Sequence, residues 1–180
     1  MSTPGCEIER VYLLDRLPEL DVLDARMETW RIDQGYLVPT EAPVSDVLKE
    51  GRIRRVELPD GEIRFIHTIK RGLGLVREEH ETEISEEEFN RLWPLTDGRR
   101  IRKVRTRIQE GALTWELDRF LDIELVLAEV ELPEVETVVE LPEWLKPRIV
   151  REVTEDPAFR NFELARQAGL LGEAEEESQQ

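Results

Sequence analysis

The chain has 180 residues, 39% hydrophobic and 37% charged, and its 41 acidic side chains outnumber 25 basic ones to give a net charge of −16. This balance argues against a nucleic acid or an anionic membrane held by bulk attraction, and no apolar stretch approaches the ~20 residues of a membrane-spanning helix. One cysteine and two histidines exclude an internal disulfide, a multi-cysteine zinc site and histidine-based metal clusters. We therefore expect a protein of the reducing cytoplasm.

Eight segments have the β-branched and aromatic content of strands and are bounded by glycine, proline or aspartate. They span residues 6–14, 30–38, 51–58, 62–71, 75–84, 101–109, 112–120 and 124–132. Turn sequences such as Pro59-Asp60-Gly61 and Glu110-Gly111 separate neighbouring segments. Because such connections are short, they predict antiparallel pairing.

A few helices are predicted around these strands. Leucines at helical spacing indicate one over residues 17–28, and the capping box from Ser85 to Glu88 begins another that Pro94 ends. Shorter helices are predicted over 142–151 and 161–169, and Asp156-Pro157 favours a final turn before the last one. We expect a single domain over residues 1–172 and a disordered acidic tail over 173–180.

Charged residues alternate with apolar ones along the strands, so they share one face of the predicted sheet. They are also sorted by sign: the third and sixth strands carry Arg52, Arg54, Lys103, Arg105 and Arg107, whereas the first, seventh and eighth carry Glu7, Glu9, Glu116, Asp118, Glu129 and Glu131. A sheet with one wet face is the common interpretation of such alternation. The sorting and the number of strands favour instead an α+β, mainly β fold, an eight-stranded antiparallel closed barrel with a few flanking helices.

Charges inside such a barrel must be paired, hydrated or bound to a ligand, because unpaired buried charges cost several kcal/mol each. Arginines fork onto phosphate oxygens, and clustered carboxylates hold Mg²⁺ or Mn²⁺. A lumen with both signs therefore suits a polyanion that chelates divalent cations.

Short motifs recur in a fixed order over about residues 6–166. They are Glu7-Ile8-Glu9, Gln34-Gly35-Tyr36-Leu37, Arg52-Ile53-Arg54, Thr68-Ile69-Lys70, Arg77 with Glu79 and Glu81, Lys103-Val104-Arg105, Thr114-Trp115-Glu116-Leu117-Asp118, Ala128-Glu129-Val130-Glu131, Glu140-Leu141-Pro142-Glu143-Trp144, and Glu152-Val153-Thr154 with Asp156-Pro157. In this order they resemble the signature of the CYTH proteins, the triphosphate tunnel metalloenzymes. The resemblance implies an eight-stranded tunnel in which two Mg²⁺ or Mn²⁺ ions support hydrolysis of inorganic triphosphate or a related triphosphate.

The resemblance also implies roles for individual residues. It assigns catalysis to Glu7, Glu9, Lys70, Glu129 and Glu131; phosphate binding to Arg52, Arg54, Lys70, Arg77, Lys103 and Arg105; metal binding to Glu7, Glu9, Glu129, Glu131 and Asp118; and support to Glu79, Glu81 and Glu116. One position departs from the family pattern, since Val11 stands where the signature has a lysine. Arg10 does not replace that lysine, because an offset of one residue points its side chain to the other face.

Two alternatives to a triphosphatase stay open. Val11 favours a catalytically weak or silent protein that binds triphosphate or polyphosphate. A class IV-type adenylate cyclase would need an adenine pocket, for which the sequence shows no signal. In each case the expected partner is a small-molecule triphosphate or polyphosphate rather than a nucleic acid or a membrane, and a homodimer is one of the oligomeric states left open.

Overall fold

A computed structural model describes residues 5–19, 27–38, 51–71 and 76–178 of the chain, and of residues 5–7, 70–71, 76–78 and 173–178 it describes the backbone. The strands are β1 (Gly5–Leu14), β2 (Met27–Leu37), β3 (Gly51–Glu57), β4 (Ile63–Arg71), β5 (Val76–Glu83), β6 (Arg100–Glu110), β7 (Leu113–Phe120), β8 (Val126–Glu131) and β9 (Ile149–Glu152). The helices are α1 (Glu86–Leu92) and α2 (Asn161–Ser178), with 3-10 turns η2 (Trp93–Thr96), η3 (Lys146–Arg148) and η4 (Pro157–Phe159). All eight predicted strand segments are confirmed to within a few residues.

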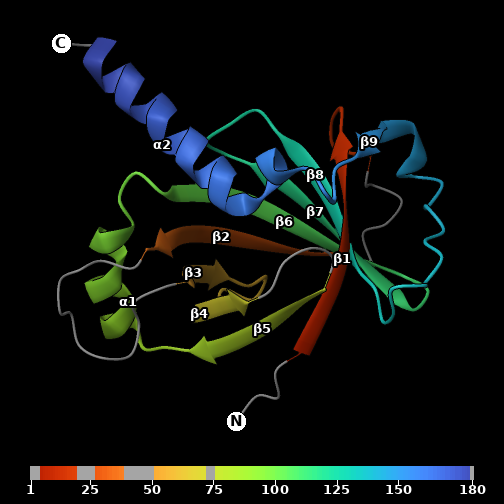
Figure 1. Cartoon of the computed structure of the whole chain (residues 1–180), viewed down its shortest axis with the longest axis horizontal. Helices are drawn as coiled ribbons and strands as arrows, with labels where there is room; N and C mark the ends of the chain where they lie inside the picture. Colours follow the sequence, from red (N-terminus) through yellow and green to blue (C-terminus); the bar gives the residue numbers. More distant parts are fainter. Residues whose placement is uncertain (1–4, 20–26, 39–50, 72–75, 179–180) are drawn as a thin grey trace.

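The strands form a single antiparallel sheet in the order β5-β4-β3-β2-β6-β7-β8-β1-β9. The strand β1 crosses the others in Figure 1 and divides its pairing among three neighbours. Its residues 9–14 pair with β8, residues 12–14 pair with β9, and residues 5–8 pair with β5. The sheet is therefore strongly curled, with one concave and one convex face.

The prediction of an eight-stranded closed barrel is wrong, because the structure is one nine-stranded sheet with two helices. The ninth strand explains the difference. Residues 142–151 were predicted as a helix, but the structure has η3 followed by β9, which pairs with β1. The strand β5 meets β1 through only the four pairs from Gly5–Glu79 to Ile8–Val76.

The helix predictions had mixed outcomes. The capping box is confirmed, since the Ser85 hydroxyl accepts a hydrogen bond of 3.1 Å from the backbone N–H of Glu88, and Asp156 likewise caps η4. The helix predicted over 17–28 is wrong at its end, where residues 27 and 28 belong to β2, and residues 20–26 lie outside the described part. The helix predicted over 161–169 extends to Ser178, into the segment expected to be disordered.

Apolar clusters cover the convex face and one end of the concave face. On the convex face, Ile8, Trp115, Leu117 and Val130 form one cluster, and Ile53 packs with the α1 residues Phe89 and Leu92 in another. On the concave face, a third cluster joins Ile101, Leu127 and Val153 to Leu164 and Ala165 of α2. Because α2 and the segment before it cover only that end (Figure 1), the rest of the concave face stays open to solvent or a ligand.

No helix within the described residues is long and apolar enough to cross a bilayer.

Candidate active site

A cavity of about 1160 Å³ lies against the concave face and is lined by side chains from each of the strands β1 to β8. The charged lining residues alternate along the strands with residues of the convex core, as the pleat requires. Its charged members are Glu9, Arg52, Arg54, Arg64, Glu79, Glu81, Arg105, Arg107, Glu116, Glu129, Glu131, Asp156 and Arg160. The sheet thus brings together, in one space, acids and bases that are spread over 150 residues of sequence.

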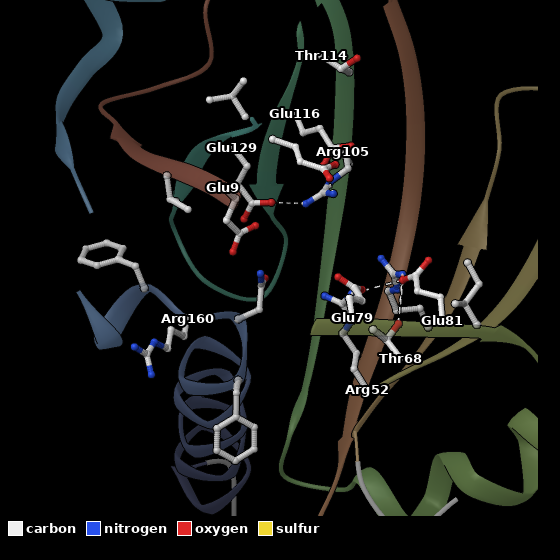
Figure 2. A pocket seen from close by; sticks show the side chains of 18 of the residues that line it. Glu9, Arg52, Thr68, Glu79, Glu81, Arg105, Thr114, Glu116, Glu129 and Arg160 are labelled. Atoms are coloured by element: carbon white, nitrogen blue, oxygen red, sulfur yellow. Dashed lines mark hydrogen bonds and ion pairs between the residues drawn. The ribbon is translucent and has the colours of Figure 1, made fainter. Parts of the chain in front are cut away.

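One group of charges lies where β3, β4 and β5 run side by side (Figure 2). The Arg52 guanidinium is 3.4 Å from Glu79, and Arg54 pairs with Glu81. The Thr68 hydroxyl donates a hydrogen bond of 2.9 Å to Glu81. These contacts follow from the register, which places Thr68 opposite both Arg52 on β3 and Glu81 on β5.

The two arginines of this group are buried and incompletely satisfied. Their side chains are only 14% and 13% exposed, and the Nε atoms of both have no hydrogen-bond partner within the described residues. Burial, together with the neighbouring charge of Arg52, lowers the pKa of Arg54 to about 10. Two buried guanidiniums with unused donors favour an anion with several oxygen atoms.

A second group is centred on Arg105 of β6. Its guanidinium donates to both carboxylate oxygens of Asp118, at 2.7 and 2.6 Å, to Glu129 at 2.6 Å, and to Glu116. Glu116 also accepts a hydrogen bond of 3.0 Å from Arg107. Figure 2 shows Arg105 directed toward Glu116 and Glu129, which come from the adjacent strands β7 and β8.

The carboxyls around Arg105 have different proton affinities. Burial opposes ionisation of Asp118, but the charges of Arg105 and Lys103 outweigh it and lower the pKa of Asp118 to about 2. For Glu129 the balance is reversed: burial and the nearby charge of Asp118 raise its pKa despite Arg105. Asp118 is therefore a fixed negative charge, while Glu129 holds a proton more readily.

The structure places most of the predicted site residues on this cavity. Those that line it are Glu9, Arg52, Arg54, Glu79, Glu81, Arg105, Glu116, Glu129 and Glu131. The predicted side chains of Glu7, Lys70 and Arg77 lie outside the described part, although the backbone register pairs Glu7 with Arg77 and Lys70 with Glu79.

Lys103 and Asp118 differ in placement from the other predicted site residues whose side chains are described. Neither is part of the lining. The Lys103 ammonium lies 2.5 Å from Asp118 and over the ring of Phe120, in a pair that is 2% and 0% exposed. Alternation predicted the concave face for both residues, and Asp118 holds Arg105 there with both of its oxygens. The predicted phosphate contact of Lys103 and metal contact of Asp118 stay predictions.

The carboxylates of β1 and β8 are the candidate ligands for a divalent metal ion. Glu9, Glu129 and Glu131 all line the cavity, and carboxylate oxygens suit Mg²⁺ or Mn²⁺. Among the described side chains no group of three or more acids, histidines or cysteines is close enough to hold an ion. These carboxylate oxygens are of the type that Mg²⁺ and Mn²⁺ bind. A complete set of ligands would need movement of these side chains or a contribution from Glu7.

Position 11 has the geometry that the sequence predicted. Val11 lines the cavity, and its backbone N–H donates to the Thr154 hydroxyl at 3.1 Å. Arg10 points away and pairs with Glu152 at 3.5 Å. The cavity therefore has no basic side chain at this point of β1.

Sequence reasoning missed several lining residues. Tyr36 belongs to a recognised motif but was given no role; its hydroxyl accepts a hydrogen bond of 3.3 Å from Gln34, and burial raises its pKa to about 12. Thr68 was also unassigned. Arg160 lies in an irregular segment between η4 and α2, where no strand alternation could reveal which way it points.

These observations define a protein with a polyanion-binding cavity in a curled antiparallel sheet. Comparison with known proteins narrows this class. The chain is 33% identical over 165 residues to an inorganic triphosphatase of Nitrosomonas europaea, across 88% of this chain and 96% of that protein. It is 40% identical over 96 residues to an inorganic triphosphatase of Acetivibrio thermocellus, across 52% of this chain and 59% of that protein.

A solved structure agrees with these relatives. The crystal structure of the inorganic triphosphatase NE1496 matches with a TM-score of 0.55 at 27% identity, over 92% of this chain and 96% of that one. No protein-family model matches the chain. The chain belongs to the family of these inorganic triphosphatases.

Proposed function

We propose that this chain hydrolyses inorganic triphosphate, and that its family is the CYTH family that the sequence motifs resemble. The observation that carries the proposal is the buried pair Arg52 and Arg54. Two like charges on one strand, with unused Nε donors, are stabilised when oxygen atoms of a bound polyanion lie between them. The names of the relatives identify inorganic triphosphate as the simplest such anion.

The reaction needs little covalent participation from the protein. Water adds to the terminal phosphorus, the bond to the bridging oxygen breaks, and phosphate and diphosphate leave. Catalysis of phosphoryl transfer is mostly positioning and stabilisation of spreading negative charge. Arg52 and Arg54 supply the stabilising positive charge from one side of the cavity. Arg105, held by Asp118, supplies positive charge from the other side.

We propose that Glu9, Glu129 and Glu131 hold Mg²⁺ or Mn²⁺ when substrate is bound, with Glu7 as a further candidate. Such an ion would neutralise phosphate oxygens and acidify a bound water. The support is the separation of charges in the cavity: acids prevail on β1 and β8, and arginines on β3 and β6. An anion carrying a divalent cation matches both sides.

The test is phosphate release from triphosphate by purified full-length protein, with Mg²⁺ or Mn²⁺. We expect one phosphate per triphosphate and little release from diphosphate. The second candidate, a silent triphosphate binder, is favoured by Val11 in the lining. Calorimetric binding of triphosphate without turnover would support the binder, and absence of both binding and turnover would refute both functions.

A further inference from the structure

The cavity-lining arginines on the strands all have a carboxylate partner. The pairs are Arg52–Glu79, Arg54–Glu81, Arg64–Glu62, Arg105–Asp118 and Arg107–Glu116. Arg160 also lines the cavity, but its guanidinium forms no ion pair or hydrogen bond with any described residue. Among the described lining arginines, Arg160 therefore offers its whole guanidinium to an anion, whereas Arg52 and Arg54 offer only their Nε donors.

The backbone holds Arg160 firmly in place at the junction of η4 and α2. Its N–H donates to Pro157 at 3.2 Å, and its carbonyl accepts from Leu164 at 3.0 Å. The next residue, Asn161, accepts a hydrogen bond of 3.3 Å from Gln34 of β2. The backbone of Arg160 is therefore fixed, while its guanidinium is exposed and has no partner among the described residues. The side chain is available to a ligand in the cavity.

The described lining residues of β1 and β8 include no basic side chain, and the positive charge nearest to them on the sheet is Arg105, which is already bound to Glu129 at 2.6 Å. Figure 2 shows Arg160 across the cavity from Arg52, on the side of Glu9 and Glu129, with its guanidinium directed away from these two acids. Among the described side chains, β1 and β8 contribute only Glu9, Val11, Glu129, Val130 and Glu131 to the lining. A polyphosphate that extends from Arg52 toward this side would meet carboxylates, Arg105 already bound to them, and Arg160.

We propose that Arg160 is a substrate-binding residue, which contacts a phosphoryl oxygen on the β1–β8 side of the cavity and supplies there the charge that Val11 lacks. This inference rests on the proposed function and extends it to a residue outside the sheet. It predicts that Arg160 acts mainly on substrate affinity. A contact made alike in ground and transition states changes KM more than kcat.

The test compares Arg160→Gln and Arg160→Lys with Arg166→Gln. Arg166 is the matched control because it is an exposed arginine of the same segment that pairs with Glu163 at 3.0 Å and does not line the cavity. With an active wild type, we expect Arg160→Gln to raise KM for triphosphate on the order of tenfold, with a smaller change in kcat. Arg160→Lys should recover part of the loss, and Arg166→Gln should match the wild type.

The outcomes separate this inference from the proposed function. If the wild type hydrolyses triphosphate and Arg160→Gln leaves KM unchanged, the role of Arg160 is refuted while the function stands. If the wild type binds triphosphate without turnover, the dissociation constant replaces KM as the readout and the same tenfold weakening is expected. If the wild type neither binds nor hydrolyses triphosphate, both proposals fail. Equal thermal unfolding midpoints for all variants would exclude misfolding as the cause of a change.

Discussion

Lys103 and Asp118 form an ion pair of 2.5 Å outside the cavity lining, and neither side chain is more than 2% exposed. Asp118 also holds Arg105 with both of its oxygens. One buried carboxylate therefore connects a buried cation outside the cavity lining with a cation that lines the cavity. Such a residue acts on the reaction through the position of Arg105.

Asp118→Asn should destabilise the protein and weaken catalysis together. Removing one member of a buried charge cluster leaves uncompensated positive charge, which costs about 3–5 kcal/mol. Urea unfolding at pH 7 measures this loss, and Asp122→Asn serves as a control because Asp122 pairs with the exposed Arg102. A variant as stable as the wild type would contradict the structural role given to Asp118.

The pKa of Asp118 predicts how stability changes in acid. Because the folded protein lowers this pKa from 3.8 to about 2, ionised Asp118 favours the folded state. Its contribution, about 2 kcal/mol, is fully present above the unfolded pKa and is lost as the pH falls through the folded one. Between pH 4 and 2, the unfolding free energy of the wild type should fall more steeply than that of Asp118→Asn. Parallel pH profiles would contradict the assignment.

Arg54→Gln should lower the rate of triphosphate hydrolysis more than a matched substitution on the other face of β3. Loss of one preorganised charge at a developing negative charge costs about 10²–10³ in rate. The matched control is Arg55→Gln, since the next residue of β3 points to the other face and pairs with Asp33 and Glu57. Equal rates for the two variants would remove the main support for the proposed phosphate site.

The strands and their faces could be predicted from sequence because a period of two is a local property. Alternation placed Arg52, Arg54, Arg105 and Glu129 on the concave face without any knowledge of pairing. The ninth strand could not be found in this way, since Ile149–Glu152 is only four residues long and becomes a strand by pairing with β1. Likewise, alternation gives the face of Lys103 but not its depth, which depends on Asp118 from the adjacent strand.

Removal of divalent metal should abolish hydrolysis and leave the fold intact. The described carboxylates Glu9, Glu129 and Glu131 are proposed as ligands, and none of them belongs to an apolar core cluster. Dialysis against a chelator followed by Mg²⁺ or Mn²⁺ should restore activity. Adding Mn²⁺ should also raise the thermal unfolding midpoint, and less so in Glu131→Gln. Full activity in the presence of chelator would refute the metal requirement.

Val11→Lys provides the strictest check on how charge is distributed over the β1–β8 side. The backbone of Val11 is held by Thr154 and Val153, so substitution changes the side chain and not the hydrogen bonds of the strand. A lysine here would project into the cavity beside Glu9. In the Arg160→Gln background it should lower KM for triphosphate on the order of tenfold, because it restores the missing positive charge.

The control for charge is Val11→Met in the same background, since methionine has comparable length and no charge. We expect no recovery from methionine, and a smaller gain from Val11→Lys when Arg160 is present, because one cation already serves this side. Such non-additivity between two positions that share a ligand is what a double-mutant cycle measures. If lysine and methionine behave alike, or if the effects of positions 11 and 160 simply add, then the two side chains do not serve the same phosphate.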